Sequence, residues 1–192
     1  MARSPKAYLL ASLIEHESCV SLKHSRCWDP TSRLKSHREE GAGLFQLTRA
    51  YHVPSGELRF DTIKDLRFKY PKYLKNLGWH NVYTRPDLQI RAGILLSKEV
   101  FLEFIPYSYN VEEALAFADA AYNGGSRGVN NERRACKLDP KCDHTRWFNH
   151  TERFCLKSRT PLYGNRSACD INRHHVRDVM LIRSSKYKPF FM

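Results

Sequence analysis

The stretch SLIEHESC, residues 12–19, places two glutamates at the end of an apolar run. On a helical wheel that advances about 100° per residue, Glu17 falls within the apolar stripe of the preceding residues and Glu15 falls on the other side. We therefore expect Glu17 to face the interior and Glu15 to face solvent. A carboxyl group in an apolar environment stays protonated more readily than one in water, and it can then act as a general acid. A solvated or arginine-paired Glu17 at the helix end is the alternative.

Helical patterns dominate the rest of the chain, and strand signals are scarce. The segment 19–40 is polar and predicts a long loop with room for a short hairpin, and beyond about residue 126 the pattern weakens into basic loops. The predicted fold class is mainly α with little β structure, in a single domain over residues 1–192. We expect helices over about 5–18 with Ser4 as N-cap, 61–75 with an interruption at Pro71, 86–104, 111–122 and 170–183.

The chain is strongly basic, with 32 Lys+Arg against 20 Asp+Glu and a formal net charge of +12. Such a charge attracts nucleic acids, anionic lipids or acidic cell-wall polymers, and it also serves solubility alone. No apolar run approaches the ~20 residues that span a bilayer, and no signal peptide is recognised at the N-terminus. The C-terminal RSSKYKPFFM, residues 183–192, combines cations with aromatic rings, which predicts either a membrane contact or a packed segment with a frayed end.

Six cysteines lie at positions 19, 27, 136, 142, 155 and 169, and no pair has the C-x-x-C spacing of common zinc or redox motifs. Gaps of 8, 6 and 14 residues suit short local disulfides in an oxidising compartment. Free thiols are an equal alternative in a protein without a signal peptide. A zinc site built from Cys136, Cys142, His144 and Cys155 is also open.

Three short motifs occur in order along the chain: ES at 17–18, GAGLFQL at 41–47 and AYNGG at 121–125. Together they resemble the lysozyme-like superfamily of soluble lytic transglycosylases and goose-type lysozymes. That family has a catalytic Glu followed by Ser, a GLMQ-like turn that enters a helix, and AYN.G at the end of another helix. The segment NRHHVRDVM, residues 172–180, resembles the family's TR.YV..V helix. The resemblance implies an α-rich lysozyme-like fold with a saccharide groove.

The resemblance also implies roles for individual residues. Glu17 takes the place of the catalytic acid, and Ser18 takes that of the serine that supports it. The positions that contact or line the path of the saccharide in the family correspond here to Phe45, Gln46, Tyr122, Asn123 and His175, the last of which replaces the family's usual tyrosine.

The number of carboxylates bears on the reaction. A glycosidase of the usual kind pairs its acid with a second carboxylate that acts as nucleophile or activates water. A lytic transglycosylase instead lets the C6 hydroxyl of the sugar attack, which forms a 1,6-anhydro end with one carboxylate. Goose-type lysozymes have an aspartate close after the turn, where this chain has Thr48, and this favours transglycosylation. Glu40 is the best second candidate, ahead of Asp29 and Glu39, and its alternative is a surface position beside Arg38.

The resemblance therefore implies an enzyme that cleaves the β-1,4 bond between N-acetylmuramic acid and N-acetylglucosamine in peptidoglycan, with no cofactor, no metal and no nucleic acid involved. In its small size and basic charge the chain resembles bacteriophage endolysins. We therefore expect synthesis in the host cytoplasm and action in the periplasm. We also expect a monomer that makes electrostatic contact with anionic membrane or lipopolysaccharide. Three alternatives stay open: a hydrolytic muramidase on the same fold, an inactive wall-binding virion protein, and a basic nucleic-acid-binding protein with a Cys/His zinc site.

Overall fold

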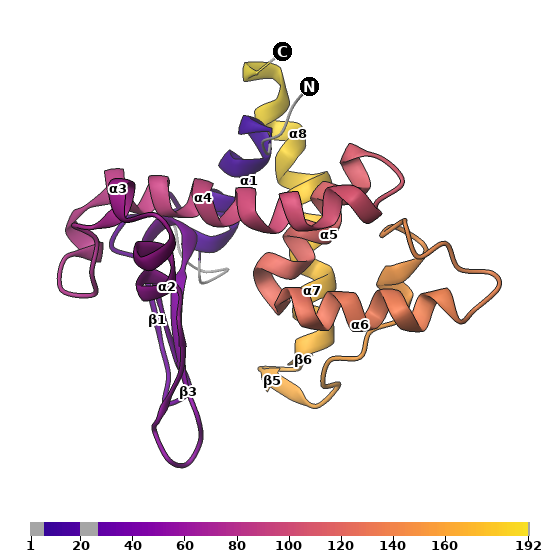
Figure 1. The fold of residues 1–192 in the computed structure, drawn as a ribbon, viewed down its shortest axis with the longest axis horizontal. Helices are drawn as coiled ribbons and strands as arrows, with labels where there is room; N and C mark the ends of the chain where they lie inside the picture. The colour runs from indigo at the N-terminus through magenta and orange to yellow at the C-terminus, as the bar shows by residue number, and fades with distance from the viewer. Residues whose placement is uncertain (1–5, 20–26, 192) are drawn as a thin grey trace. The chain divides into compact units, whose positions relative to one another are not determined.

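The computed structural model describes residues 6–19 and 27–191, and the predicted N-cap Ser4 lies outside them. The chain divides into two units, which we describe separately: unit 1 comprises residues 1–9 and 97–192, and unit 2 comprises residues 10–96 (Figure 1). Helices account for 58% of the residues and the sheets are small and antiparallel, so the prediction of a mainly helical chain is confirmed. The prediction of a single catalytic domain stays a prediction.

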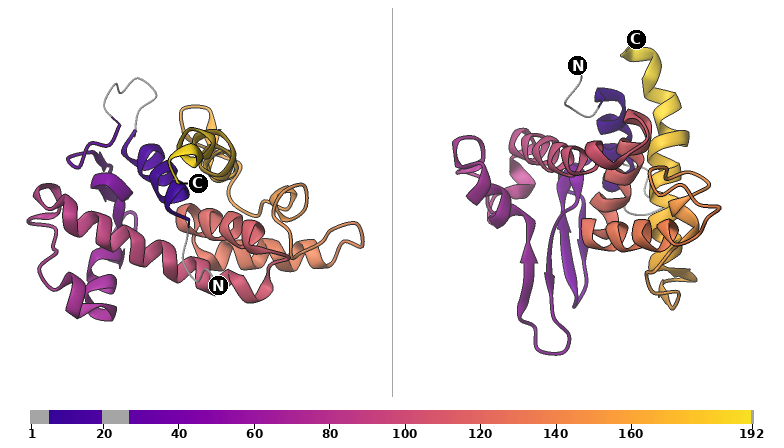
Figure 2. Two further views of the ribbon diagram at one scale, coloured as in Figure 1. Left: turned by 90° about the horizontal axis from the view of Figure 1, so that it is seen from above. Right: turned by 45° about the vertical axis from the view of Figure 1, so that its right-hand side comes forward.

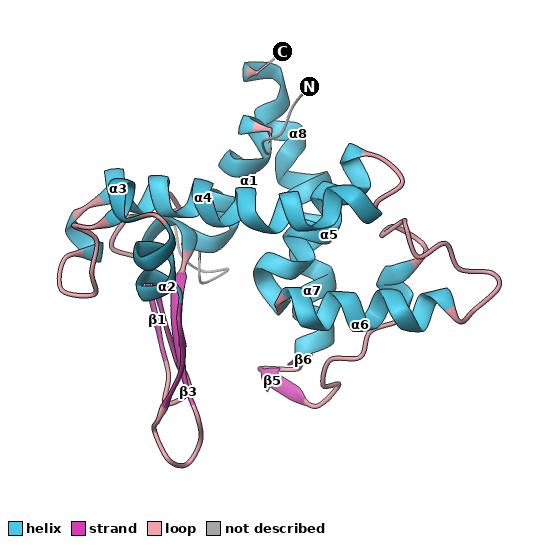
Figure 3. Ribbon diagram, viewed as in Figure 1, coloured by secondary structure: helices cyan, strands magenta, loops and turns pink. Residues whose placement is uncertain are grey.

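Unit 2 contains most of helix α1 (Ala7–Ser18) and a four-stranded antiparallel sheet in the order β1-β2-β3-β4, drawn in magenta in Figure 3. A 3-10 turn over Gly43–Phe45 joins β2 to β3. The strands are β1 (Arg33–Lys35), β2 (Glu39–Ala42), β3 (Leu47–Tyr51) and β4 (Leu58–Asp61), and the helices that follow are α2 (Thr62–Lys69), α3 (Pro71–Leu74) and the first part of α4 (Pro86–Phe104).

One rung of this sheet consists of alternating charges across all four strands. Glu40 on β2 lies opposite Lys35 on β1 and Arg49 on β3, and Arg49 in turn lies opposite Asp61 on β4. Opposite charges at facing positions stabilise neighbouring strands. The sheet is therefore held partly by residues whose polar character gave no hydrophobic strand pattern, which is why the sequence predicted only a loop with room for a short hairpin over 19–40. The turn that enters a helix in the resembling family leads here into strand β3 instead.

Unit 1 is built around α5 (Val111–Gly124), in which Ala114 to Ala121 are all buried. Helix α5 packs against α6 (Ser126–Lys137) and α7 (Ala168–Arg177), as Figures 1 and 2 show. Stacked rings of Phe104 and Phe117, with Trp147 at an edge to Phe117, fill the core beside it. A short hairpin, β5 (Pro161–Tyr163) with β6 (Arg166–Ser167), precedes α7, and a π-helical segment (Asp178–Arg183) and α8 (Ser184–Tyr187) follow it.

Helix α6 was not predicted, because only three of its side chains face the core. Val129, Glu132 and Cys136 are buried along a helix that is otherwise polar and basic. Gly125 has a φ of +81°, which glycine adopts readily, and it is the single residue between the end of α5 at Gly124 and the start of α6 at Ser126. The expectation of basic loops after residue 126 is therefore wrong for the segment 126–137.

The six cysteines form three disulfides, Cys19–Cys27, Cys136–Cys142 and Cys155–Cys169. This confirms the local pairing and corrects the two alternatives of free thiols and of a zinc site on the late cysteines, whose sulfurs are used in disulfides. Among the described residues, no group of three or more His, Cys, Asp or Glu side chains is placed to hold a metal ion. Within the same residues, no helix combines the length and the apolar character needed to cross a membrane.

Candidate functional site

The C-terminal end of α1, which carries Glu17, is fixed by Ser18. The Ser18 hydroxyl is buried, donates to the carbonyl of Ile14 (2.6 Å) and accepts from the backbone N–H of Trp28 (2.7 Å). The Ser18 carbonyl accepts from the hydroxyl of Ser32 (3.0 Å). These bonds tie the segment that contains Trp28 and Ser32 to the last turn of the helix, so the backbone next to Glu17 is held in place.

The turn over Gly43–Phe45 is hydrogen-bonded to Ser32 as well. The Gly43 N–H donates to the Ser32 carbonyl (2.7 Å), and the Gln46 amide donates to the carbonyls of Ser32 (3.3 Å) and Gly43 (3.0 Å). Both Gly43 and Gln46 have positive φ, +71° and +43°, which reverses the chain between β2 and β3. Ser18 and Gln46, from two separate sequence motifs, are thus linked through Ser32. The Gln46 nitrogen is directed into this link, so the predicted substrate-facing glutamine acts first as part of the protein's own turn.

Gln89 on α4 is a further part of this turn that the sequence analysis missed. Its side chain is fully buried, accepts from the Leu44 N–H (2.8 Å) and donates to the carbonyls of Pro30 (2.9 Å) and Val82. A Cβ at Gly43 would lie 2.2 Å from the Gln89 Oε1, so position 43 requires glycine for space as well as for its backbone angle. The available signal was an amide in the first turn of a largely apolar helix.

Glu17 and Glu15 do not differ in exposure in the way that the helical wheel predicted. Leu13 and Ile14 are buried as predicted, at 5% and 6% exposed, but both glutamates are partly exposed. Glu17 stands one residue from the end of α1, where the apolar face gives way to the following loop. The expectation of an interior-facing Glu17 is therefore corrected to a carboxyl group at the border between core and solvent.

Phe45 does not line an open groove. It is fully buried (0% exposed), and a Cβ on Gly93 of α4 would lie 2.2 Å from its ring. The absence of a side chain at Gly93 makes the space for the phenyl ring. Phe45 therefore anchors the turn to the core of unit 2, which corrects its predicted role.

Glu40 is buried at 4% exposed and has three partners inside unit 2. Its carboxylate oxygens lie 2.6 Å from Arg33 and 2.7 Å from Arg49, and accept from the Tyr83 hydroxyl at 3.1 Å. Burial alone would raise the pKa of Glu40, but the hydrogen bonds from Arg49, Arg33 and Tyr83 outweigh it and hold the pKa below its ordinary value. Burial and the neighbouring carboxylate raise the pKa of Tyr83 to about 12. Glu40 is neither a surface residue beside Arg38 nor a carboxylate open to a water molecule.

We expect low pH to reduce the stability of unit 2 because Glu40 becomes protonated. Because its pKa is lower in the folded state than in the unfolded chain, its stabilisation is fully present above the unfolded-state pKa and is lost as pH falls through the folded-state pKa. Glu40→Gln removes the charge that Arg33 and Arg49 share, and because both arginines are partly exposed it should lower the free energy of unfolding by about 2 kcal/mol at pH 7. In urea titrations from pH 7 downward the gap from wild type should narrow below about pH 4. Glu57→Gln, an exposed change in the same unit, is the control. A gap that stays constant with pH would contradict the assignment.

In unit 1, the end of α5 carries Tyr122 and Asn123, and the last turn of α7 carries His175. The rings of Tyr122 and His175 are stacked with centroids 6.5 Å apart, and the His175 Nδ1 lies 2.8 Å from the Asp119 carboxylate. His175 is only 1% exposed, whereas Tyr122 is partly exposed and Asn123 is exposed. His175 therefore supports the Tyr122 ring from the buried side, which is the packing role of the two roles that the sequence left open.

Two buried polar residues that the sequence analysis did not single out support these side chains. Asp119, in an alanine-rich helix, orients His175, and Asn172 donates to the side chain of Asn123 (3.0 Å). A carboxylate inside the run ALAFADAAY was the available signal for the first. No protein-family model, curated protein or solved structure matches this chain. The resemblance to lysozyme-like enzymes therefore rests on the sequence motifs and on the contacts within each unit.

Proposed function

We propose that this protein degrades peptidoglycan, with Glu17 as the acid that cleaves the β-1,4 bond between N-acetylmuramic acid and N-acetylglucosamine, as a lytic transglycosylase on a lysozyme-like fold. The observation that carries the proposal is the hydrogen-bonded path from Ser18 through Ser32 to Gln46. Two motifs that lie far apart in the sequence, and that belong to one site in the resembling family, are neighbours in unit 2. A chance match of short motifs gives no reason for this proximity.

The proposed reaction needs one carboxyl group. The Glu17 carboxyl gives its proton to the glycosidic oxygen as the bond from that oxygen to C1 of the muramic acid breaks. The resulting carboxylate then takes the proton of the C6 hydroxyl while the C6 oxygen bonds to C1. The products are a free hydroxyl on one sugar and a 1,6-anhydro ring on the other, and the enzyme recovers its protonated acid.

The surroundings of Glu40 and Thr48 support transglycosylation over hydrolysis. Glu40 is engaged with two arginines and a tyrosine, and the Thr48 hydroxyl donates to the Gln46 carbonyl (2.7 Å). Asp29 accepts from the backbone and hydroxyl of Thr31, at 2.8 and 2.7 Å. Two of the three candidates for a second catalytic carboxylate, Glu40 and Asp29, are thus committed to the sheet and to the loop.

The other parts of the proposal concern binding and place of action. The partly exposed ring of Tyr122 and the exposed amide of Asn123 are the groups of unit 1 suited to a saccharide, because rings stack on sugar faces and amides bond to their oxygens. The net charge of +12 favours an anionic wall polymer, and exposed Phe190 and Phe191 lie close to Lys186 and Lys188 at the C-terminal end. We propose the role of a phage endolysin that acts on the wall from the periplasm.

Mass spectrometry of digested peptidoglycan tests the reaction. Purified sacculi incubated with the protein should release muropeptides that are one water lighter than those from a hydrolytic lysozyme run in parallel, because the anhydro end forms without water. Products with the same mass as those of the hydrolytic lysozyme would show that the reaction is hydrolysis and that the substrate is still peptidoglycan. No soluble product from sacculi of several wall types, with a folded protein, would refute the proposed function.

A further inference from the structure

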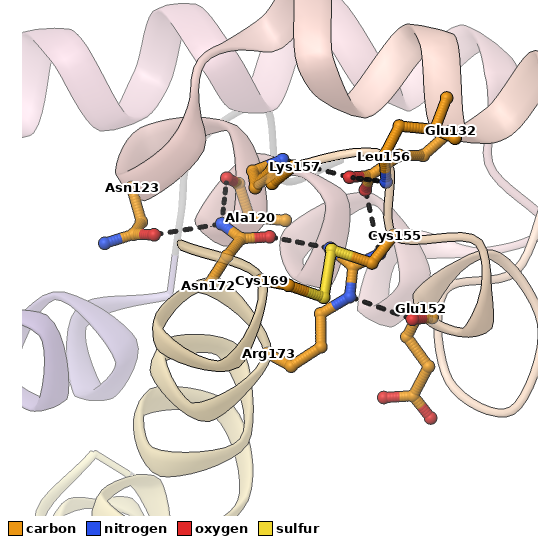
Figure 4. A network of polar contacts seen from close by, with 10 residues as sticks. All are labelled: Ala120, Asn123, Glu132, Glu152, Cys155, Leu156, Lys157, Cys169, Asn172 and Arg173. Atoms are coloured by element: carbon orange, nitrogen blue, oxygen red, sulfur yellow. Dashed lines mark hydrogen bonds and ion pairs between the residues drawn. A yellow bond between two sulfur atoms is a disulfide. The ribbon is translucent and has the colours of Figure 1, made fainter. Parts of the chain in front are cut away.

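The side chain of Asn123 is held in one orientation by a buried network (Figure 4). Its Oδ1 accepts a hydrogen bond from the Asn172 amide (3.0 Å), and the same Asn172 nitrogen also donates to the Ala120 carbonyl (2.9 Å). Figure 4 shows the nitrogen of Asn123 pointing away from the network. Asn123 thus turns its acceptor toward the protein and its two donors away from it.

The donor and acceptor character of the neighbouring groups determines which end of each amide carries the oxygen. The Ala120 carbonyl can only accept, and the Arg173 guanidinium, 2.8 Å from the Asn172 Oδ1, can only donate. Asn172 must therefore direct its NH₂ group toward Ala120 and Asn123. Asn123 in turn must offer its oxygen to Asn172, because two NH₂ groups do not bond to each other.

Arg173, which orients Asn172, is itself fixed. Its Nε donates to the Glu152 carbonyl (2.8 Å), its guanidinium lies 4.7 Å above the Trp147 ring, and it forms an ion pair with Glu132 (2.9 Å). Glu132 is fully buried and also binds the Lys157 ammonium (3.1 Å). Polar contacts run from Lys157 to Glu132, from Glu132 to Arg173 and from Arg173 to Asn172, so the rotation of one of these side chains would break its contact with the next.

We propose that Asn172 is a positioning residue that sets the Asn123 amide as a hydrogen-bond donor, so that Asn123 selects an acceptor oxygen of the saccharide, a hydroxyl or an acyl carbonyl. The inference rests on the proposed function for the identity of the ligand, and on the network alone for the orientation of the amide. Asn172 is buried at 0% exposed and does not touch the ligand.

The experiment combines Asn172→Asp, Asn123→Asp and Asn123→Ala. The Asn172→Asp variant has no NH₂ group at position 172, so Asn123 should turn its nitrogen inward and present an oxygen outward. The Asn123→Asp variant keeps the acceptor at position 123 and loses the donor. Each change should raise KM on soluble uncrosslinked glycan strands about tenfold, with kcat within about twofold, since one binding contact is lost in ground state and transition state alike. In the Asn123→Ala background, Asn172→Asp should raise KM no further.

Controls separate this result from a loss of folding and from failure of the proposed function. Asn165→Asp makes the same chemical change at an exposed turn and should leave KM unchanged. A KM equal to that of wild type in Asn123→Asp would overturn the inference, and so would additive increases of KM in the double variant. If Asn172→Asp does not fold, the KM of Asn123→Asp, a change at an exposed position, still tests the inference. If the wild-type protein cleaves no glycan, the proposed function fails. The orientation is then decided by the NMR signals of the Asn123 NH₂ group, which must shift in Asn172→Asp and stay in place in Asn165→Asp.

Discussion

Glu17→Gln should reduce the release of muropeptides by about a hundredfold to ten-thousandfold, the usual contribution of a general acid. Glutamine keeps the shape of the side chain but has no proton to give to the leaving oxygen. The change lies at a partly exposed position at the end of α1, so the fold should be retained. Product release from sacculi, followed by chromatography, measures the first effect, and circular dichroism with urea unfolding measures the second.

Glu15→Gln is the matched control, because it makes the same change on the same helix at a similarly exposed position. Its activity should remain within about twofold of wild type. An equal loss in both variants would show that charge on α1, and not one acid, supports activity. Substantial activity in Glu17→Gln would remove Glu17 as the acid while leaving the substrate class open to a direct test.

Glu132→Gln should destabilise unit 1 by about 3–5 kcal/mol, the largest stability effect we expect from a single charge. The neutral amide would leave Lys157 and Arg173, both mostly buried, without their shared counter-charge. The loss is large because two cations remain in a poorly solvated place, rather than because the intact ion pairs add that much stability. The midpoint of urea unfolding, followed by circular dichroism, checks the value.

Glu112→Gln provides a control with the same chemistry at a different depth. Glu112 forms an ion pair with Lys6 at 3.1 Å, the same distance as between Glu132 and Lys157, but its side chain is 64% exposed and that of Glu132 is 0% exposed. An exposed pair contributes little, so the change should cost no more than about 0.5 kcal/mol. Similar losses in the two variants would mean that burial does not set the energetics of the Glu132 cluster.

Where the sequence carried an apolar period and a terminator, the helices followed it. Helix α4 spans Pro86–Phe104 as predicted, with proline at its first position, and α2 and α3 are separated just before Pro71 as the interruption indicated. The sheet and α6 were missed because few of their side chains are apolar and face the core. Some of their inward-facing residues are charged, such as Glu40, which pairs with Arg49, and Glu132, which pairs with Lys157, and these partners lie in other elements. A pattern along one segment contains no information on such partners.

The candidate site shows the same division. The motifs contain Ser18 and Gln46, and the structure links these two residues through Ser32, which no motif contained. The burial of Phe45 depends on the missing side chain of Gly93, and the burial of His175 depends on Asp119 in another helix. Which of these side chains face inward could not be predicted until the opposing elements were known.

The three disulfides each join a cysteine to the next one along the chain. Six thiols allow 15 ways of pairing, and this one is the arrangement in which no loop encloses or crosses another. Each bond can therefore close as soon as its own short segment has been made, in the order of synthesis. Production in an oxidising compartment should give native bonds without an isomerase, whereas a preparation left reduced should need only mild oxidant and little reshuffling to recover them.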